Sequence, residues 1–325
     1  MKILITGGGG FLGRKLAAAL LTRGRLADRR GALSDIEEIV LFDASADNPL
    51  EDPRVRTVTG SVCEESALAT AISDDIDSVF HLAAVVSGEA EADFDKGMTV
   101  NLGGTLAVLN TCRRLSHAPR VVFTSSVAAF GGDLPDAVTD TTAPTPQSSY
   151  GAQKVIGELL VNDYSRKGFI DGRVLRLPTV CVRPGAPNKA ASGFASAMVR
   201  EPLNGVATQC PVPPSTLMWV MSPSTAVANL VYGHDLPAAA WGYQRVINLP
   251  GLTVSADEML TAVRSVCGDG VADLIEWRRD PAVEGVVATW PGRFDSARAN
   301  VLGFSTDPDF ESVVREYLQE IGRQA

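Results

Sequence analysis

The chain has 325 residues, of which 45% are hydrophobic and 21% charged, and its formal net charge at pH 7 is −9. This acidic balance, with no basic run, argues against nucleic acid and anionic membrane surfaces as partners. Three histidines without metal-ligand spacing predict no metal site, and no apolar run reaches the roughly 18 residues of a membrane span. The five cysteines are dispersed and no signal-peptide pattern is present, so we expect a cytoplasmic protein with reduced thiols.

Short apolar, β-rich runs alternate with helical patterns in the first half of the chain. Strands are predicted at residues 2–6, 39–43, 55–59, 78–82, 120–125 and 173–177. Helices are predicted at residues 11–23, 64–73, 95–115 and 149–167, the last with Ser148 or Ser149 as N-cap and Gly168 as its stop. This alternation predicts an α/β fold with a doubly wound parallel sheet of the Rossmann type.

Beyond about Pro178 the sequence becomes richer in Pro, Gly, Ser and Asn. Helices are predicted near residues 192–200, 223–234, 255–267 and 307–321, and a strand at 245–249. The change in composition predicts a nucleotide-binding domain over residues 1–177 and a smaller, mainly substrate-binding part over residues 178–325. The helix near 223–234 is expected to return to the first domain.

A glycine-rich turn, Thr6–Gly13, joins the first strand to the first helix. Gly7, Gly10 and Gly13 fit a G-x-x-G-x-x-G pattern, which allows a tight turn and close approach of the backbone to a pyrophosphate. The helix N-terminus then offers N–H groups and the positive end of its dipole to the phosphates. A glycine-rich turn without a ligand is the alternative, and the strand, the helix and a later acidic residue all weigh against it.

Asp43 ends the strand at 39–43 and is that acidic residue. Its carboxylate can accept hydrogen bonds from the adenosine ribose hydroxyls and repels a 2′-phosphate, so we predict NAD rather than NADP as the cofactor. An aspartate that serves only a turn or a helix cap is the alternative.

Tyr150 and Lys154 stand at positions i and i+4 of the helix predicted at 149–167, and therefore on one face of it. A tyrosine acts as a base at neutral pH only if nearby positive charge lowers its pKa, and Lys154 and the nicotinamide ring would supply that charge. Ser126 ends a strand at the carboxyl edge of the sheet, where it would hold the reacting oxygen. Strand alternation favours Ser126 over Ser125. The Tyr–Lys spacing alone is common on ordinary helices, and only the serine and the glycine turn make it indicative of hydride transfer.

These motifs resemble the extended short-chain dehydrogenase/reductase family, of the NAD-dependent epimerase/dehydratase type, over residues 1–180. Tyr150–Lys154 matches the YxxxK signature of that family, and Ser126 completes its catalytic triad. Phe130 is a departure, because sugar-nucleotide epimerases usually have a tyrosine there. The resemblance implies that the cofactor is bound by Gly7, Gly10, Phe11, Leu12, Gly13, Asp43, Ser61, Val62, Leu82, Ala83, Ala84, Asn101, Tyr150, Lys154, Pro178 and Val180.

The second half resembles those family members that oxidise a 2-hydroxy sugar acid to its 2-keto acid with NAD. The similarity lies in the segments 176–185, 187–189, 221–223 and 290–295. A sugar acid needs a cation for its carboxylate, and Arg183 and Lys189 are the candidates, with solvated surface charges as the alternative. Ser125 and Ser126 complete the substrate contacts that we predict.

Three other functions fit the same sequence. They are a sugar-nucleotide epimerase or dehydratase, a dehydrogenase of another secondary alcohol, and a non-catalytic NAD-binding regulator. An epimerase needs a large diphosphate site, for which the second half has few basic clusters, and a regulator has no need of the triad.

The resemblance also implies a homodimer formed through the helices 95–115 and 149–167. Outside the site, His81 is expected to be structural, and His117 and His234 to lie in loops or at the surface.

Overall fold

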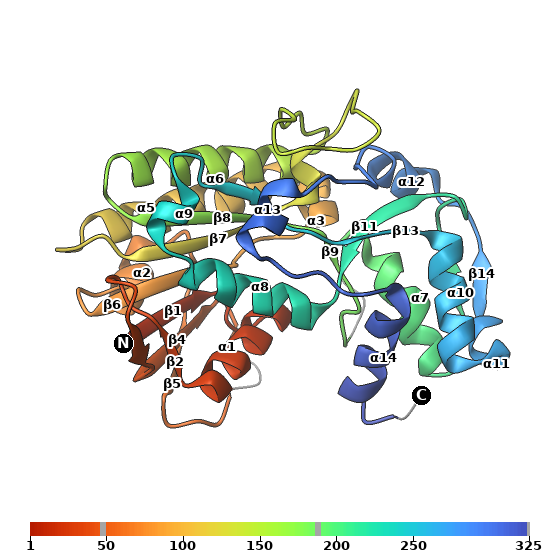
Figure 1. Ribbon diagram of the computed structural model, residues 1–325, viewed down its shortest axis with the longest axis horizontal. Coiled ribbons are helices and arrows are strands. Elements are labelled where there is room, and N and C mark those ends of the chain that lie inside the picture. Colours follow the sequence, from red (N-terminus) through yellow and green to blue (C-terminus); the bar gives the residue numbers. More distant parts are fainter. Residues whose placement is uncertain (46–49, 186–189, 324–325) are drawn as a thin grey trace.

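The computed structural model describes residues 1–45, 50–185 and 190–323. Its centre is a seven-stranded parallel sheet with the strand order β12-β8-β7-β6-β1-β4-β5 (Figure 1). The strands are β1 (Lys2–Thr6), β4 (Glu38–Asp43), β5 (Val55–Thr59), β6 (Ile76–His81), β7 (Arg120–Ser126), β8 (Asp171–Leu177) and β12 (Val246–Asn248). Every strand predicted in the first half is present, and β12 is the strand predicted at 245–249.

The sheet is doubly wound. From β1 the chain continues to β4 and β5 on one side, and then crosses back to β6, β7, β8 and β12 on the other. Open parallel sheets bind their ligands at the carboxyl ends of the strands where the order reverses, which is between β1 and β6 in this fold. Almost every residue of β1 and β7 is buried, as expected for strands with helices on both faces.

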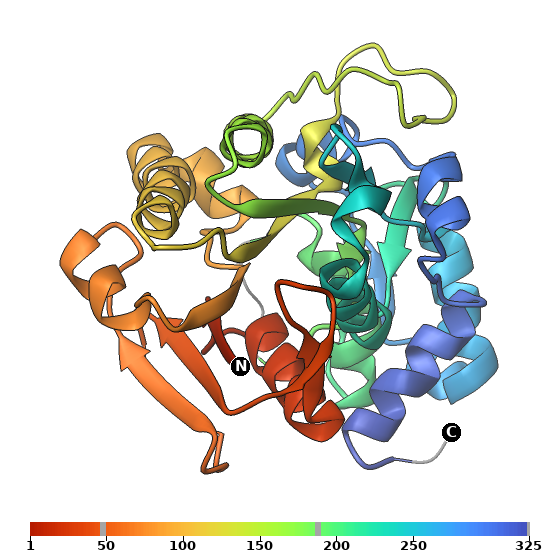
Figure 2. The same cartoon turned by 60° about the vertical axis from the view of Figure 1, so that its left-hand side comes forward.

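Helices cover both faces of the sheet (Figure 2). They are α1 (Phe11–Arg23), α2 (Glu65–Ala71), α5 (Gly104–Arg113), α6 (Ser149–Arg166) and α8 (Pro223–Asp235). Ile3 and Ile5 pack with α1 and α8 in one apolar core, whereas Leu4 packs with α2, α5 and α6 in another. Successive strand residues point to opposite faces, so β1 contributes to both cores in turn.

The helix predicted at 95–115 is interrupted. It consists of α4 (Phe94–Gly97), a π-helical turn (Met98–Gly103) and α5. Cβ atoms at Gly97 and Gly104 would lie only 2.5 Å from Gln153 Nε2 and 2.6 Å from Val62 Cγ2, so the segment is pressed against its neighbours. Asn101, on the π turn, donates from Nδ2 to Gln153 Oε1 at 2.7 Å. These contacts with α6 and with the loop after β5 accompany the wider turn, and a periodic pattern does not reveal them.

A second core lies beside the sheet domain. Its helices are α7 (Gly193–Leu203), α10 (Ala256–Cys267) and α14 (Phe310–Glu320), and its small sheet has the order β13 (Leu252–Ser255), β11 (Leu217–Met221), β9 (Thr179–Val180). The remaining short elements are β2 (Arg25–Ala27), β3 (Leu33–Asp35), β10 (Thr208–Cys210), β14 (Ile275–Trp277), α3 (Ser87–Ala92), the 3₁₀ turn Val127–Ala129, α9 (Ala238–Trp241), α11 (Asp269–Ala272), α12 (Pro281–Val287) and α13 (Ala297–Leu302). These elements were not predicted, because segments of so few residues show no clear hydrophobic period. Among the described residues no helix is both long and apolar enough to cross a membrane.

His234 is buried, so its predicted place in a loop or at the surface was wrong. It lies on the last turn of α8, where its Nε2 hydrogen-bonds Ser78 Oγ of β6 at 2.8 Å and its Nδ1 lies 3.0 Å from Asp235 Oδ1. Burial lowers the pKa of His234 to about 4. Because α8 packs against the central strands β7 and β8, even the end of this helix is internal.

Candidate active site

The glycine turn after β1 forms a close-packed cradle at the N-terminus of α1. Gly7 has φ +71°, and a Cβ there would lie 2.8 Å from the backbone nitrogen of Ala83. A Cβ on Gly13 would overlap the carbonyl oxygen of Gly7. Gly10 stands at the N-cap of α1 and provides no side-chain acceptor for the first N–H groups of the helix. Such a cradle fits a pyrophosphate, which needs close backbone approach and N–H donors.

Asp43 ends β4 beside this cradle. Its Oδ2 accepts a hydrogen bond from Gly9 N at 3.0 Å, and its Oδ1 accepts one from Ser45 N at 3.2 Å. Each carboxylate oxygen has a second lone pair, so these bonds leave acceptor capacity for a ribose hydroxyl. The same contacts also hold the glycine turn in place.

Ser61 and Val62 follow β5, the strand next to β4. Gly60 N donates to the Asp43 carbonyl oxygen at 2.8 Å, which brings this loop alongside the end of β4. Ser61 is half-buried, and Val62 is buried against Gly104 of α5. Both residues therefore lie at the outer end of the sheet edge, away from the triad.

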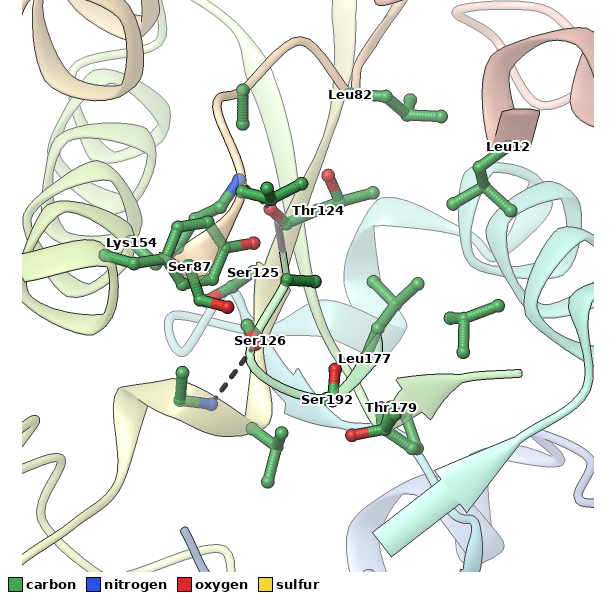
Figure 3. A pocket seen from close by; sticks show the side chains of 18 of the residues that line it. Leu12, Leu82, Ser87, Thr124, Ser125, Ser126, Lys154, Leu177, Thr179 and Ser192 are labelled. Atoms are coloured by element: carbon green, nitrogen blue, oxygen red, sulfur yellow. Dashed lines mark hydrogen bonds between the residues drawn. The ribbon is translucent and has the colours of Figure 1, made fainter. Parts of the chain in front are cut away.

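Tyr150 reaches the end of β7 because α6 starts against the 3₁₀ turn that follows this strand. Ser148 caps α6 by accepting a hydrogen bond from Gly151 N at 3.2 Å. A Cβ on Gly151 would overlap the carbonyl oxygen of Ala128, so the close contact requires glycine. Ser126 Oγ accepts a hydrogen bond from Ala128 N at 3.2 Å, the dashed line in Figure 3, and the Ser126 side chain lies close enough to Tyr150 to lower its pKa.

Lys154 is buried one turn further along α6. Its Nζ donates to the Thr124 carbonyl oxygen at 2.8 Å and lies 5.5 Å from the centre of the Tyr150 ring. Burial lowers the pKa of Lys154 to about 8, and the negative charge of Glu158 acts in the opposite direction. The ammonium is thus fixed to the strand that carries Ser126.

The pKa of Tyr150 is raised above its usual value near 10, mainly by burial, with Arg183 and Ser126 acting to lower it. The sequence predicted that Lys154 lowers the pKa of Tyr150. In the protein without cofactor this pKa is raised instead, because desolvation of the phenolate outweighs the effect of the nearby charge. The Arg183 charge acts to lower the pKa of Tyr150.

Arg183 lies in the loop after β9. Its backbone N donates to Ser196 Oγ at 3.0 Å and its Nε to the Val180 carbonyl oxygen at 3.1 Å, so the loop and the guanidinium are both held. Burial lowers the pKa of Arg183, whereas Tyr150 raises it. Lys189, the other predicted carboxylate ligand, lies outside the described residues.

Ser125 points into the protein next to Ser126. It is 3% exposed, and its Oγ donates to Glu158 Oε1 at 2.5 Å. This bond occupies the Ser125 hydroxyl proton, so Ser126 is the better placed of the two serines for a substrate, as strand alternation suggested.

One pocket joins the glycine turn to the triad. Most of the predicted site residues line it: Gly7, Gly10, Phe11, Leu12, Gly13, Leu82, Ala84, Ser125, Ser126, Tyr150, Lys154, Pro178, Val180 and Arg183. The pocket lies at the carboxyl ends of β1, β6, β7 and β8, which is where the reversed strand order places ligands.

Comparison with known proteins identifies the family. Residues 3–241 match the NAD dependent epimerase/dehydratase family. The chain belongs to this family. The predicted family resemblance, fold class and NAD cofactor are thereby confirmed.

Two relatives are similar over almost their whole length. The D-erythronate dehydrogenase of Cupriavidus necator is 55% identical over 322 residues, 99% of each chain. That of Haemophilus influenzae is 42% identical over 320 residues, 98% of this chain and 99% of the relative. A solved structure described as the nucleoside-diphosphate-sugar epimerase from Agrobacterium tumefaciens superposes with a TM-score of 0.90 at 39% identity, covering 99% of this chain and 95% of that one. The NAD complex of UDP-glucose 4-epimerase from Thermus thermophilus shares the fold, with a TM-score of 0.80 at 20% identity and 97% coverage of both chains.

Asn101 and Ala83, which the family resemblance led us to predict as cofactor contacts, lie behind the pocket. Asn101 is 4% exposed, accepts from Val85 N at 2.8 Å and donates to Val85 O at 3.2 Å, so its side chain holds the loop after β6. Ala83 N donates to Thr6 Oγ1 at 3.3 Å and lies against Gly7. Both therefore shape the backbone that lines the pocket.

Several lining residues were not predicted. They are Val85, Val86, Ser87, Thr124, Val127, Ala128, Leu177, Thr179, Ala190, Ser192 and Trp290. Thr124 lies near the end of the strand predicted at 120–125, and Ser87 follows the strand predicted at 78–82, so both could have been predicted from the sequence. Ser192 and Trp290 come from the second part, and only the tertiary fold brings them to the triad.

His81 is structural, as predicted. It is buried between Thr6 Oγ1, 2.7 Å from Nδ1, and Thr105 Oγ1, 3.0 Å from Nε2, and burial lowers its pKa to about 3. Within the part of the chain that the structure describes, no cluster of three or more His, Cys, Asp or Glu side chains could hold a metal ion.

Proposed function

We propose that this protein oxidises D-erythronate to 2-keto-D-erythronate with NAD. The observation that carries the proposal is the meeting of Tyr150, Ser126 and Arg183 in one pocket, which combines a base, an oxygen-binding hydroxyl and a cation for a carboxylate. The two D-erythronate dehydrogenases that match nearly the whole chain support this choice of acid.

The residues at the edge of the sheet fit NAD. Gly7, Gly10 and Gly13, with the N-terminus of α1, would hold the pyrophosphate, and Asp43 the adenosine ribose. The further proposed cofactor contacts are Phe11, Leu12, Ser61, Val62, Leu82, Ala83, Ala84, Asn101, Pro178 and Val180. When bound, NAD supplies the acceptor for the hydrogen and the electron pair that leave C2 of the substrate.

Tyr150, in its deprotonated form, accepts the proton of the C2 hydroxyl. Ser126 binds the same hydroxyl oxygen and holds it in line with Tyr150. Lys154, fixed to the Thr124 carbonyl oxygen, places positive charge next to the phenolate and would bind the nicotinamide ribose. Arg183 binds the substrate carboxylate, and its charge also favours the phenolate.

We assign cofactor binding to residues 1–177, with Pro178 and Val180 as contacts just beyond them, and substrate binding mainly to residues 178–325. Arg183 belongs to the second part, and the triad belongs to the first. The two parts do not correspond simply to two successive segments of the chain. Helix α8 and strand β12 come after residue 177, yet α8 packs on β7 and β8, and β12 pairs with β8. The substrate would therefore lie where the two parts meet.

The test is NADH formation with a panel of four-carbon and six-carbon sugar acids, L-threonine and UDP-sugars. We expect accumulation of NADH with D-erythronate and none with UDP-sugars. The 39% identical structure described as a nucleoside-diphosphate-sugar epimerase favours the alternative function. An epimerase would convert a UDP-sugar without net NADH and would copurify with NAD, and that result would replace the present proposal.

We further propose a homodimer formed through α5 and α6. Large apolar side chains are exposed on these helices, with Leu106 and Ile156 each 38% and Leu159 66% exposed. Light scattering should give twice the chain mass, and Leu159→Glu should give the monomer. Val301→Glu on α13, where the side chain is 88% exposed, is the matched control and should leave the dimer intact.

The proposed location is the cytoplasm. The five cysteines are all free thiols, which suits a reducing compartment. Fractionation of cells that express the tagged chain tests this assignment.

A further inference from the structure

Three hydroxyl side chains of largely buried residues line the triad pocket (Figure 3). Ser87 begins α3, Thr179 lies on β9, and Ser192 precedes α7. Their exposed fractions are 9%, 7% and 7%. None of the three belongs to the triad, and each comes from a different element.

Ser192 stands at the N-cap of α7 but does not cap it. Three other N-cap serines, Ser148, Ser222 and Ser255, each accept a hydrogen bond from the backbone N–H three residues later, at 3.1–3.2 Å. A serine is favoured at this position because of that bond. The side chain of Ser192 has no hydrogen-bond partner among the described residues, so its hydroxyl is left for the pocket.

The neighbouring hydroxyls extend this polar patch. Ser87 Oγ accepts a hydrogen bond from Ala191 N at 3.2 Å, which ties α3 to the residue before Ser192 and leaves the Ser87 proton free to donate. The Thr179 hydroxyl also has no side-chain partner in the described ranges. Ser192 and Thr179 are largely buried residues that line the pocket, so hydroxyls there without a protein partner are free to bind a polar ligand.

We propose that Ser192, with Ser87 and Thr179, forms a subsite that binds the hydroxyl groups beyond C2 of a short polyhydroxy acid. The inference rests on the proposed function and deepens it. Tyr150 and Ser126 bind the C2 hydroxyl, and Arg183 binds the carboxylate. The remaining hydroxyls of the substrate therefore need hydrogen-bond partners of their own. The subsite would make the enzyme selective for a sugar acid over a 2-hydroxy acid with a plain alkyl chain. A site built to bind a substrate hydroxyl rejects an analogue that lacks it, because its own polar groups are then left unpaired.

The experiment compares D-erythronate with (R)-2-hydroxybutanoate, which keeps the four carbons, the carboxylate and the C2 hydroxyl but has no hydroxyl at C3 or C4. In Ser192→Ala, kcat/KM for D-erythronate should fall by about tenfold, mostly through KM, from the loss of one or two hydrogen bonds. The value for (R)-2-hydroxybutanoate should change by less than about twofold, since that substrate makes no such bond. If its turnover is too slow, its inhibition constant against D-erythronate is measured in its place.

Two variants serve as controls. Ser255→Ala removes an N-cap serine of α10 outside the pocket, and should leave the selectivity between the two acids unchanged. Ser192→Thr keeps a hydroxyl and should restore most of the selectivity. An equal loss for both acids in Ser192→Ala, or no loss for either, would overturn the subsite. A wild-type enzyme that oxidises no sugar acid would instead refute the proposed function, so the two failures are distinct.

Discussion

Glu158 binds Arg176 through two hydrogen bonds, 2.8 Å from Nε to Oε1 and 2.6 Å from Nη2 to Oε2, in the interior next to the triad. Their side chains are only 3% and 10% exposed. Glu158 also accepts the Ser125 hydroxyl, so one carboxylate joins α6, β7 and β8 behind the catalytic strand end. It stands one helical turn after Lys154, which itself is bonded to the residue before Ser125.

Glu158→Gln should shift the pH dependence of the reaction. The carboxylate raises the pKa of Lys154 against burial, so its loss lowers that pKa further below about 8 and leaves less ammonium at a given pH. We expect the alkaline limb of kcat/KM to move to lower pH. The other charged or titratable groups near Lys154 are Tyr150 and His81, which the change leaves in place.

The same substitution leaves the buried Arg176 without its carboxylate partner, which should cost about 3 kcal/mol or more in the free energy of unfolding. Urea unfolding measures this loss, and Glu284→Gln in the more exposed pair with Arg279 is the control, expected to cost far less because exposed ion pairs contribute little to stability. A variant that loses stability but keeps the wild-type pH profile would show that Glu158 is structural only.

Tyr150→Phe tests the base. The variant keeps the ring but has no group to accept the hydroxyl proton, so kcat should fall by at least about 100-fold, the usual size of a general-base effect. NADH affinity, measured by fluorescence titration, should stay close to that of the wild type. Turnover like that of the wild type would exclude Tyr150 as the base.

Arg183 has two proposed roles, and the pH dependence of kcat/KM distinguishes them. Its charge lowers the pKa of Tyr150, so Arg183→Gln should raise that pKa and move the rising limb of kcat/KM to higher pH. It should also raise KM for a sugar acid by about tenfold or more, since a hydrogen bond to a charged group contributes about 1.5–3 kcal/mol. Arg183→Lys keeps the charge and should leave the limb in place, while it loses the bidentate contact and weakens binding. If both variants show the same profile, the charge of Arg183 does not reach Tyr150.

The sequence predicted those parts of the site that local packing and helical periodicity determine. Gly13 is required by close packing within one turn, and Tyr150 and Lys154 share a face because of the helical period. What it missed depends on contacts between distant segments. Ser192 reaches the pocket only because the second part folds over the sheet edge, and the raised pKa of Tyr150 depends on burial that no spacing reveals. The glycine after Tyr150 was a visible signal, but its reason, the carbonyl of Ala128, lies on another element.

Asp43→Ser should change the choice of cofactor. The carboxylate would bind the adenosine ribose and repel a 2′-phosphate, so its removal should lower kcat/KM for NAD by about tenfold and raise the relative rate with NADP. The ratio of kcat/KM for the two cofactors is the measurement. Asp35→Ser, at an 84% exposed carboxylate, is the control. An unchanged ratio would remove Asp43 from the cofactor site and leave it as the residue that holds Gly9.

The buried histidines should make the fold sensitive to mild acid. Burial lowers the pKa of His81 to about 3 and that of His234 to about 4, from 6.5 in the unfolded chain. The unfolded chain therefore binds protons first, so stability is full above pH 6.5 and falls as the pH drops toward the folded values. One such histidine costs about 2 kcal/mol between pH 6.5 and 5. Urea unfolding at several pH values should show a smaller loss in His234→Gln than in the wild type, with His117→Gln as the control. An equal loss in all three proteins would mean that the carboxylates, and not the buried imidazole of α8, set the acid limit of this fold.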